Sequence, residues 1–482
     1  MKIAKTKIVC TIGPASSNIE VIRKMARHGM DVVRLNFSHG QKEEHKKIIE
    51  AVKTIEKEEG IEIAIMQDLQ GPKIRTSKVE NGAVELKENQ EFIITTDEIE
   101  FGNSQKVSTK YKDLINEVKK GNTVLLDDGY IILKCINIQN NDIITKVIKG
   151  GILKDNKGII VPGSKSNAPS LSEKDIEDLK FGLENGVDLV ALSFVKKPED
   201  ILELKTAMKI FGRQVPVIAK IERAESFEHI DQIIKESDGI MVARGDLGLE
   251  MPLEELPLLQ KELIKKANNE GKPVITATQM LESMIKNPIP TRAETSDVAN
   301  AVLDGTDAVM LSGETSVGDY PVESVEFMHK IIYKTETLAL KKLNFRNISQ
   351  NLHLSSANVS DSIAVSTVVL ATNINAKAII TATKWDYTAR KIAKNRPNIP
   401  IIALTTDETN LAYLNLIWGV IPYKLPEELS YMRERNDANS NNFLLKLLKS
   451  KDIAKEGDLI VFVTGLSENN VNESNYIKVI EL

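Results

Sequence analysis

The chain has 482 residues, 42% of them hydrophobic and 27% charged, which indicates a globular protein of two or more domains. Its formal net charge of −5 gives no basic surface field and argues against a nucleic-acid partner. Cys10 and Cys135 are the only cysteines, and no apolar run is long enough for a signal segment or a membrane span. We therefore expect a cytoplasmic protein with no membrane partner.

Eight short apolar runs, each closed by polar or charged residues, dominate the first two thirds of the chain. Amphipathic helical stretches lie between most of them. Regular alternation of strand and helix predicts parallel pairing with right-handed crossovers, and eight such units predict an α/β fold of the (β/α)8 TIM barrel type. The runs are 7–12, 31–38, 63–68, 188–194, 216–222, 239–244, 273–278 and 307–312, and the helical stretches include 19–28, 43–58, 173–184, 198–211, 226–235 and 253–268.

A long segment between the third and fourth runs breaks this alternation. Residues 72–170 consist of short β segments separated by turn pairs such as Asn81-Gly82 and Asp128-Gly129, which predicts a small inserted β-barrel domain. An insertion at this place would lie over the C-terminal ends of the barrel strands, where it could act as a lid.

After a helix starting near Pro321 and an irregular linker, a second α/β pattern follows. We expect helices over 361–371, 388–395 and 409–418 and strands over 378–382, 400–405 and 458–464. Nothing in this part resembles a catalytic cluster, so a regulatory or oligomerising role is the default. The predicted domains are the barrel in two parts, 1–70 and 170–343, the inserted lid, 71–169, and the C-terminal α/β domain, 344–482.

The polar residues at the strand ends carry the chemistry. Alternation along a strand sends Lys220 and Glu222 to one face, and Asp246 follows from the next strand. Two carboxylates beside a lysine suit a divalent cation that holds phosphate oxygens. Arg34 offers a planar donor fork for phosphate. Other polar side chains that end the predicted strands are Asn36, Ser38, Asp68, Thr278 and Ser312.

Any one of these residues alone could be a strand cap or a surface ion pair, but their repetition at equivalent strand ends favours a site. The phosphate-binding loop ending in Gly-Lys-Ser/Thr is absent, because Gly271-Lys272 is followed by Pro273. The protein-kinase motifs are also absent. Nucleotide binding, if present, is of another type.

Seven longer motifs resemble those of the pyruvate kinases, in that family's order and spacing, over nearly the whole chain. The resemblance implies transfer of the phosphoryl group of phosphoenolpyruvate to ADP, giving pyruvate and ATP, in the last step of glycolysis. The motifs are Thr11-Ile-Gly-Pro-Ala-Ser16, Arg34-Leu-Asn-Phe-Ser-His-Gly40, Gly71-Pro-Lys-Ile-Arg-Thr76, Ala219-Lys-Ile-Glu222, Met241-Val-Ala-Arg-Gly-Asp-Leu-Gly248, Ala277-Thr-Gln-Met-Leu-Glu-Ser-Met284 and Leu311-Ser-Gly-Glu-Thr315.

The resemblance also implies roles for single residues. Glu222 and Asp246 would hold a divalent metal, Mg²⁺ or Mn²⁺, and Lys220 would be the transition-state cation. Thr278, with Ser312 and water, would relay a proton to the enolate. The remaining implied contacts are phosphoenolpyruvate with Arg34, Lys220, Gly245, Asp246 and Thr278; nucleotide phosphates with Arg75 and Lys157; and K⁺ with Asn36, Ser38, Asp68 and the Leu69 carbonyl.

Two departures from the family pattern give further hypotheses. Many members carry glutamate where this chain has Lys73, whose ammonium could replace the monovalent cation, so we predict activity without added potassium. In the C-terminal domain, Trp385, Asp386 and the acidic loop 465–474 would disfavour a phosphate. We therefore predict weak or no activation by fructose 1,6-bisphosphate.

Two alternatives stay open at this stage. One is another phosphoenolpyruvate-handling barrel, a synthase or carboxylase, which would lack the ADP site implied by Arg75 and Lys157. The other is a non-catalytic scaffold, which would be expected to have lost Lys220 or the metal carboxylates. The resemblance further implies a homotetramer formed through barrel and C-terminal contacts.

Overall fold

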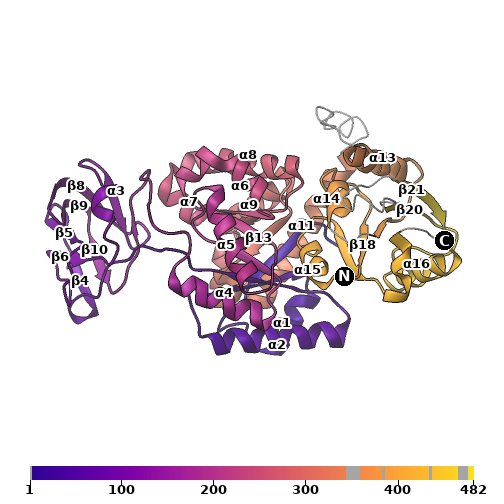
Figure 1. The fold of residues 1–482 in the computed structure, drawn as a ribbon, viewed down its shortest axis with the longest axis horizontal. Coiled ribbons are helices and arrows are strands. Elements are labelled where there is room, and N and C mark those ends of the chain that lie inside the picture. Colours follow the sequence, from indigo (N-terminus) through magenta and orange to yellow (C-terminus); the bar gives the residue numbers. More distant parts are fainter. Residues whose placement is uncertain (1–2, 343–358, 383–385, 434–436, 465–475) are drawn as a thin grey trace.

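The computed structural model describes residues 3–342, 359–382, 386–433, 437–464 and 476–482. Three regions follow one another along the long axis of the molecule (Figure 1). An inserted β-rich region lies at one end, the barrel occupies the middle, and the C-terminal region lies at the other end. Among the described residues, no helix combines the length and the apolar content needed to span a bilayer.

Eight parallel strands form the closed barrel, in the order β1-β16-β15-β14-β13-β12-β3-β2, as predicted. Their residues are almost all buried, because the barrel interior covers one face and the helices cover the other. This double burial explains why the strands read as continuous apolar runs. The strands are β1 Lys7–Thr11, β2 Val32–Asn36, β3 Ala64–Asp68, β12 Leu189–Leu192, β13 Val217–Ile221, β14 Gly239–Ala243, β15 Val274–Ala277 and β16 Ala308–Leu311.

The barrel helices surround the strands and have well-defined ends. Ser172 and Thr291 form capping boxes with Asp175 and Glu294 at two helix starts. The helices are α1 Ile19–Arg27, α2 Lys42–Glu59, α4 Glu173–Asn185, α5 Pro198–Ile210, α6 Ile230–Glu236, α7 Arg244–Glu250, α8 Leu256–Glu270, α9 Arg292–Asp304, α10 Gly313–Ser316 and α11 Pro321–Lys342.

The inserted region leaves the barrel after β3 and returns before α4, at the C-terminal rim as predicted. Its strands form a six-stranded sheet, β11-β7-β8-β9-β5-β6, and a two-stranded ribbon, β10-β4, which together make a half-barrel. Its elements are β4 Ala83–Leu86, β5 Glu91–Thr95, β6 Lys106–Ser108, α3 Leu114–Glu117, β7 Thr123–Leu126, β8 Ile131–Gln139, β9 Asp142–Lys149, β10 Gly151–Lys154 and β11 Ile159–Ile160.

The C-terminal region is a separate α/β domain, also as predicted. Its sheet has the order β19-β18-β17-β20-β21, parallel except for β21. The two edge strands, β19 and β21, and one helix, α16, were not among the elements expected from the sequence. The exact limits of the domains stay predictions. The elements are α13 Val359–Asn373, β17 Ile379–Ala382, α14 Tyr387–Ala393, β18 Ile401–Thr405, α15 Glu408–Leu414, β19 Val420–Lys424, α16 Ala438–Ser450, β20 Leu459–Thr464 and β21 Tyr476–Glu481.

The barrel and the C-terminal domain share one hydrophobic core. Side chains inside the barrel, such as Val9 and Ile275, belong to the same buried cluster as Ile379 and Ile417 of the C-terminal domain. Polar contacts reinforce the junction. Asn415 Nδ2 donates to the carbonyl oxygens of Asp31 and Glu62, at 2.8 Å each. The C-terminal domain thus closes the end of the barrel opposite the predicted site.

Candidate active site

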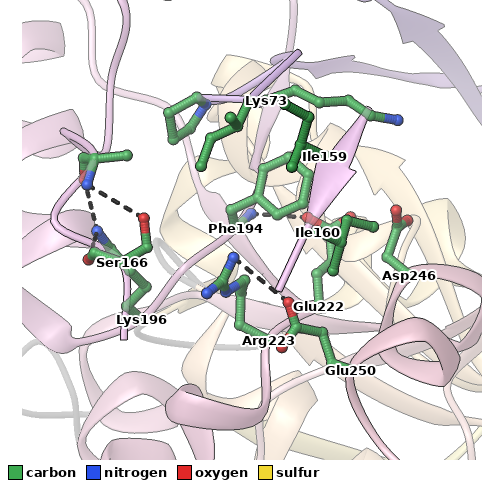
Figure 2. A pocket seen from close by; sticks show the side chains of 13 residues that line it. Lys73, Ile159, Ile160, Ser166, Phe194, Lys196, Glu222, Arg223, Asp246 and Glu250 are labelled. Carbon is green, nitrogen blue, oxygen red and sulfur yellow. Dashed lines mark hydrogen bonds and ion pairs between the residues drawn. The ribbon is translucent and has the colours of Figure 1, made fainter. Parts of the chain in front are cut away.

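A cleft of about 1300 Å³ lies where the inserted region faces the C-terminal ends of the barrel strands. Lys73 and Asp246 line both this cleft and a smaller adjoining pocket. Figure 2 shows the pocket, with Lys73 and Ile159 from the inserted side and Glu222 and Asp246 from the barrel. The predicted site therefore lies between the two regions, with walls from both.

Lys220 is the centre of a buried polar cluster. Its ammonium lies 2.9 Å from Glu222 Oε1 and 3.1 Å from Asp68 Oδ1. It also donates to Ser193 Oγ at 2.7 Å. Alternation along β13 places Lys220 and Glu222 on one face, as predicted, and β3 and β12 bring Asp68 and Ser193 to the same height.

Burial and charge act in opposite directions on the pKa values of this cluster. Burial alone would lower the pKa of Lys220, but Asp68 and Glu222 raise it above its ordinary value. Burial alone would raise the pKa of Asp68, but Lys220 and Arg34 hold it below its ordinary value. The ammonium and the Asp68 carboxylate therefore stay charged at neutral pH.

Arg34 completes the neutralisation of Asp68. Its guanidinium contacts Asp68 Oδ2 through Nη2 at 2.6 Å and through Nε at 2.7 Å. Its Nη1 donates to Thr11 Oγ1 at 2.9 Å. Arg34, in the middle of β2, is thereby held in place, and its positive charge lies near that of Lys220.

Glu222 and Asp246 form the acidic side of the site. Glu222 is 2% exposed, and its Oε2 accepts a hydrogen bond from the Phe194 backbone N–H at 2.7 Å. Burial raises the pKa of Glu222; Lys220 opposes this shift and Asp246 adds to it. Among the described residues, the Asp246 carboxylate makes no hydrogen bond or ion pair within the protein. Two nearby carboxylates with only one ammonium between them leave unbalanced negative charge.

This imbalance fits a divalent cation. The described part of the chain contains no cluster of three or more His, Cys, Asp or Glu side chains placed to hold a metal. Two carboxylates with open positions are nevertheless what Mg²⁺ commonly uses when substrate phosphates and water complete its shell. Glu222 and Asp246 are therefore suitable metal ligands in the presence of a phosphorylated substrate.

Thr278 and Ser312 lie directly after β15 and β16. Thr278 Oγ1 accepts from Gly245 N at 2.8 Å and donates to the Ala277 carbonyl at 2.6 Å. The Ser312 hydroxyl is buried and has no hydrogen-bond partner in the described protein. The structure thus places both predicted hydroxyls at the strand ends, with Gly245 beside Thr278.

The three predicted cations of the inserted side lie together at its hinge. Arg75 pairs with Gly158 in a β-bridge, and its Nη1 donates to the Asn156 carbonyl at 3.1 Å. Lys157 contacts Asp127 at 2.7 Å. The Lys73 ammonium, which Figure 2 shows turned outward, lies 3.5 Å from Asp128. Lys73 is therefore paired within the inserted region and does not contact Asp68.

The four predicted ligands of a monovalent cation are partly occupied by protein donors. Both Asp68 oxygens contact cationic side chains, and the Leu69 carbonyl accepts from Ser193 Oγ at 2.7 Å. Asn36 Oδ1 accepts from Ser38 N at 3.1 Å. Ser193 was not predicted as a site residue. It is the polar residue next to the end of the fourth apolar run, and that position was the available signal.

The closed barrel, with an inserted β-region over a cluster of lysine, arginine and carboxylates, fits a phosphotransferase. Two family models match the chain: "Pyruvate kinase, barrel domain" over residues 3–325 and "Pyruvate kinase, alpha/beta domain" over residues 361–480. The chain belongs to the pyruvate kinase family, and its reaction is the transfer of the phosphoryl group of phosphoenolpyruvate to ADP.

Individual relatives agree with this assignment. Pyruvate kinases of Geobacillus stearothermophilus and Bacillus licheniformis are each 45% identical to this chain, over 98% of it and 80% of the relative. A crystal structure of a pyruvate kinase from Cryptosporidium parvum superposes with a TM-score of 0.92 at 38% identity, covering 99% of this chain and 96% of that one. Family membership over the whole chain excludes the synthase or carboxylase alternative. A non-catalytic scaffold would be expected to lack Lys220 or the metal carboxylates, whereas this chain has Lys220, Glu222 and Asp246.

Proposed function

We propose that the cluster around Lys220 is the place where the phosphoryl group passes between phosphoenolpyruvate and ADP. The observation that carries the proposal is the contact of one buried ammonium with Asp68, Ser193 and Glu222, next to Asp246. Phosphoryl transfer depends mainly on positioning and on neutralising the charge of the moving group. Lys220 and Arg34 are rigidly held cations that serve this purpose.

Glu222 and Asp246 would hold the divalent metal, Mg²⁺ or Mn²⁺. When bound, this ion supplies positive charge to the substrate oxygens. Arg75 and Lys157, at the hinge of the inserted region, would face the nucleotide phosphates, and closure of that region would exclude water. The Thr278 hydroxyl, with Ser312 and water, would deliver the proton that converts the enolate to pyruvate.

Metal binding tests this assignment without relying on turnover. Glu222→Gln and Asp246→Asn should each weaken Mn²⁺ binding, measured by electron paramagnetic resonance, by about tenfold or more, since even indirect partners of a metal contribute 10–100-fold. Asp200→Asn is the matched control, because Asp200 is buried and accepts backbone N–H groups of Lys196 and Lys197 away from the cluster. Unchanged Mn²⁺ binding in both site variants would contradict the metal assignment.

We further propose that the enzyme needs no added potassium. Lys73 stands where many family members carry glutamate, and Lys220 and Arg34 already balance the charge of Asp68. Because Lys73 pairs with Asp128, its contribution would be to the charge of the cleft and not a direct replacement of an ion at Asp68. Many-fold activation by potassium over a tetramethylammonium control would refute the proposal.

Two family-level expectations complete the proposal. We expect a homotetramer, which sedimentation equilibrium would test. We also expect weak or no activation by fructose 1,6-bisphosphate. Trp385 and loop 465–474 lie outside the described residues, whereas Asp386 forms an ion pair with Arg390. A large fall in half-saturating phosphoenolpyruvate on adding that sugar would count against this expectation.

A further inference from the structure

The segment that follows β15 has a backbone conformation that its residues do not favour. Thr278 has φ 68° and Gln279 has φ 54°, both in the left-handed region. A β-branched residue there is a genuine outlier, and its strain persists only where the surrounding structure offsets it. Contacts from the surrounding structure must therefore hold Thr278 in place.

Arg244, the first residue of α7, supplies these contacts. Its Nη2 donates to the Thr278 carbonyl at 2.7 Å, and its Nε donates to the Ala277 carbonyl at 3.2 Å. The next residue, Gly245, donates its backbone N–H to the Thr278 hydroxyl at 2.8 Å. The first two residues of α7 thus fix both the backbone and the side chain of Thr278.

Arg244 is itself held by side chains of two further helices. Its Nη1 lies 2.8 Å from the Asp297 carboxylate on α9 and 3.4 Å from Gln260 Oε1 on α8. The side chain of Arg244 is 15% exposed. A guanidinium can reach two carbonyls and a carboxylate at once because its donors form a planar fork, whereas a lysine ammonium cannot reproduce that geometry.

We infer that Arg244 is a positioning residue for Thr278: it holds the left-handed conformation in which the Thr278 hydroxyl lies beside the Gly245 backbone N–H, next to Asp246 in the chain. The inference rests on the proposed proton-delivering role of Thr278. Arg244 acts through the two carbonyls and does not need to touch the substrate. Asp297 supports it by keeping the guanidinium in the orientation that reaches them.

The proton step can be followed separately from phosphoryl transfer. The enzyme with its divalent metal and phosphate should exchange the methyl hydrogens of pyruvate with deuterated solvent, and nuclear magnetic resonance measures this rate. Thr278→Ala should lower the exchange rate by about 10²–10⁴-fold, the usual contribution of a general acid or base. Arg244→Lys should lower it by about tenfold or more, with a larger effect on kcat than on the KM for phosphoenolpyruvate.

A double-mutant cycle separates positioning from general destabilisation. If Arg244 acts through Thr278, Arg244→Lys should change the exchange rate less than about twofold in the Thr278→Ala background. Asp297→Asn, which keeps Arg244, should lower the exchange rate by a smaller factor. It replaces Arg244→Lys as the test variant if Arg244→Lys folds poorly. Arg396→Lys is the matched control, because Arg396 also joins a carboxylate, an amide and a backbone carbonyl, at the other end of the barrel.

The outcomes distinguish the inference from the proposal beneath it. Full exchange activity in Thr278→Ala would contradict the proposed proton-delivering role of Thr278. If Thr278→Ala loses exchange but folded Arg244→Lys and Asp297→Asn keep it, the positioning role is wrong. Equal losses from Arg244→Lys in both backgrounds, or an equal loss in Arg396→Lys, would also overturn it. The positioning role is supported if Arg244→Lys lowers the exchange rate only where Thr278 is present and if Arg396→Lys leaves the rate unchanged.

Discussion

Replacing Lys220 by methionine should damage both activity and stability, for reasons that the structure separates. Methionine keeps much of the aliphatic volume and removes the charge. Glu222 and Asp68 are 2% and 1% exposed, and among the described residues Lys220 is the one cation that contacts Glu222. Asp68 keeps Arg34. Breaking a buried pair costs about 3–5 kcal/mol, and we expect the lower end because one of the two carboxylates stays paired.

The effect on turnover is expected to be larger than this loss of stability suggests. Removing a preorganised transition-state donor lowers kcat by about 10²–10³-fold. A lactate dehydrogenase-coupled assay with saturating phosphoenolpyruvate and ADP measures kcat, and urea unfolding measures stability. Lys7→Met is the matched control: Lys7 is 6% exposed and contacts Asp31 and the Val420 carbonyl at the opposite end of the barrel. A Lys220→Met enzyme that folds and keeps more than a tenth of wild-type kcat would refute the reasoning.

Three further predictions concern other parts of the molecule. Lys73→Glu should create potassium activation, measured against tetramethylammonium, because it replaces a cation of the cleft with the residue many family members carry; equal rates in both salts would contradict this. Burial raises the pKa of Glu56 from 4.5 to about 7, so ionisation of this carboxyl destabilises the folded protein as the pH rises through that range. Glu56→Gln should therefore raise the melting temperature at pH 8 but not at pH 4.5. Asn415→Leu should cost about 1–3 kcal/mol in urea unfolding, because it removes both hydrogen bonds and leaves the Glu62 carbonyl without its side-chain donor, whereas the exposed Asn398→Ala should cost little.

The barrel could be predicted from the sequence because its strands are buried on both faces and end in charge. The edge strands of the C-terminal sheet could not. β19 contains Pro422, which usually argues against a strand, and β21 contains Lys478 and Glu481 among its apolar residues. Edge strands tolerate such residues because one side of their backbone needs no partner.

The predicted site residues divide in the same way. Residues that end a strand, such as Lys220, Glu222 and Thr278, follow from strand alternation and motif. The partner of Lys73 does not, because Asp128 lies on a turn of the inserted region that only the tertiary fold brings near. The left-handed conformation of Thr278 is also invisible in sequence, since threonine itself disfavours it.

The core shared by the barrel and the C-terminal domain has a consequence for how the protein can be divided. A chain cut after α11 would lack the C-terminal domain, and the N-terminal ends of the barrel strands would face water. Val9, Ile275 and their neighbours would then lose the apolar side chains that now pack against their cluster. The catalytic half is therefore not an independent module that could be exchanged between relatives. A ligand that displaced the C-terminal sheet would also displace the barrel side chains packed against it. Because these side chains belong to the barrel strands, the displacement would reach the opposite strand ends, where Lys220 lies.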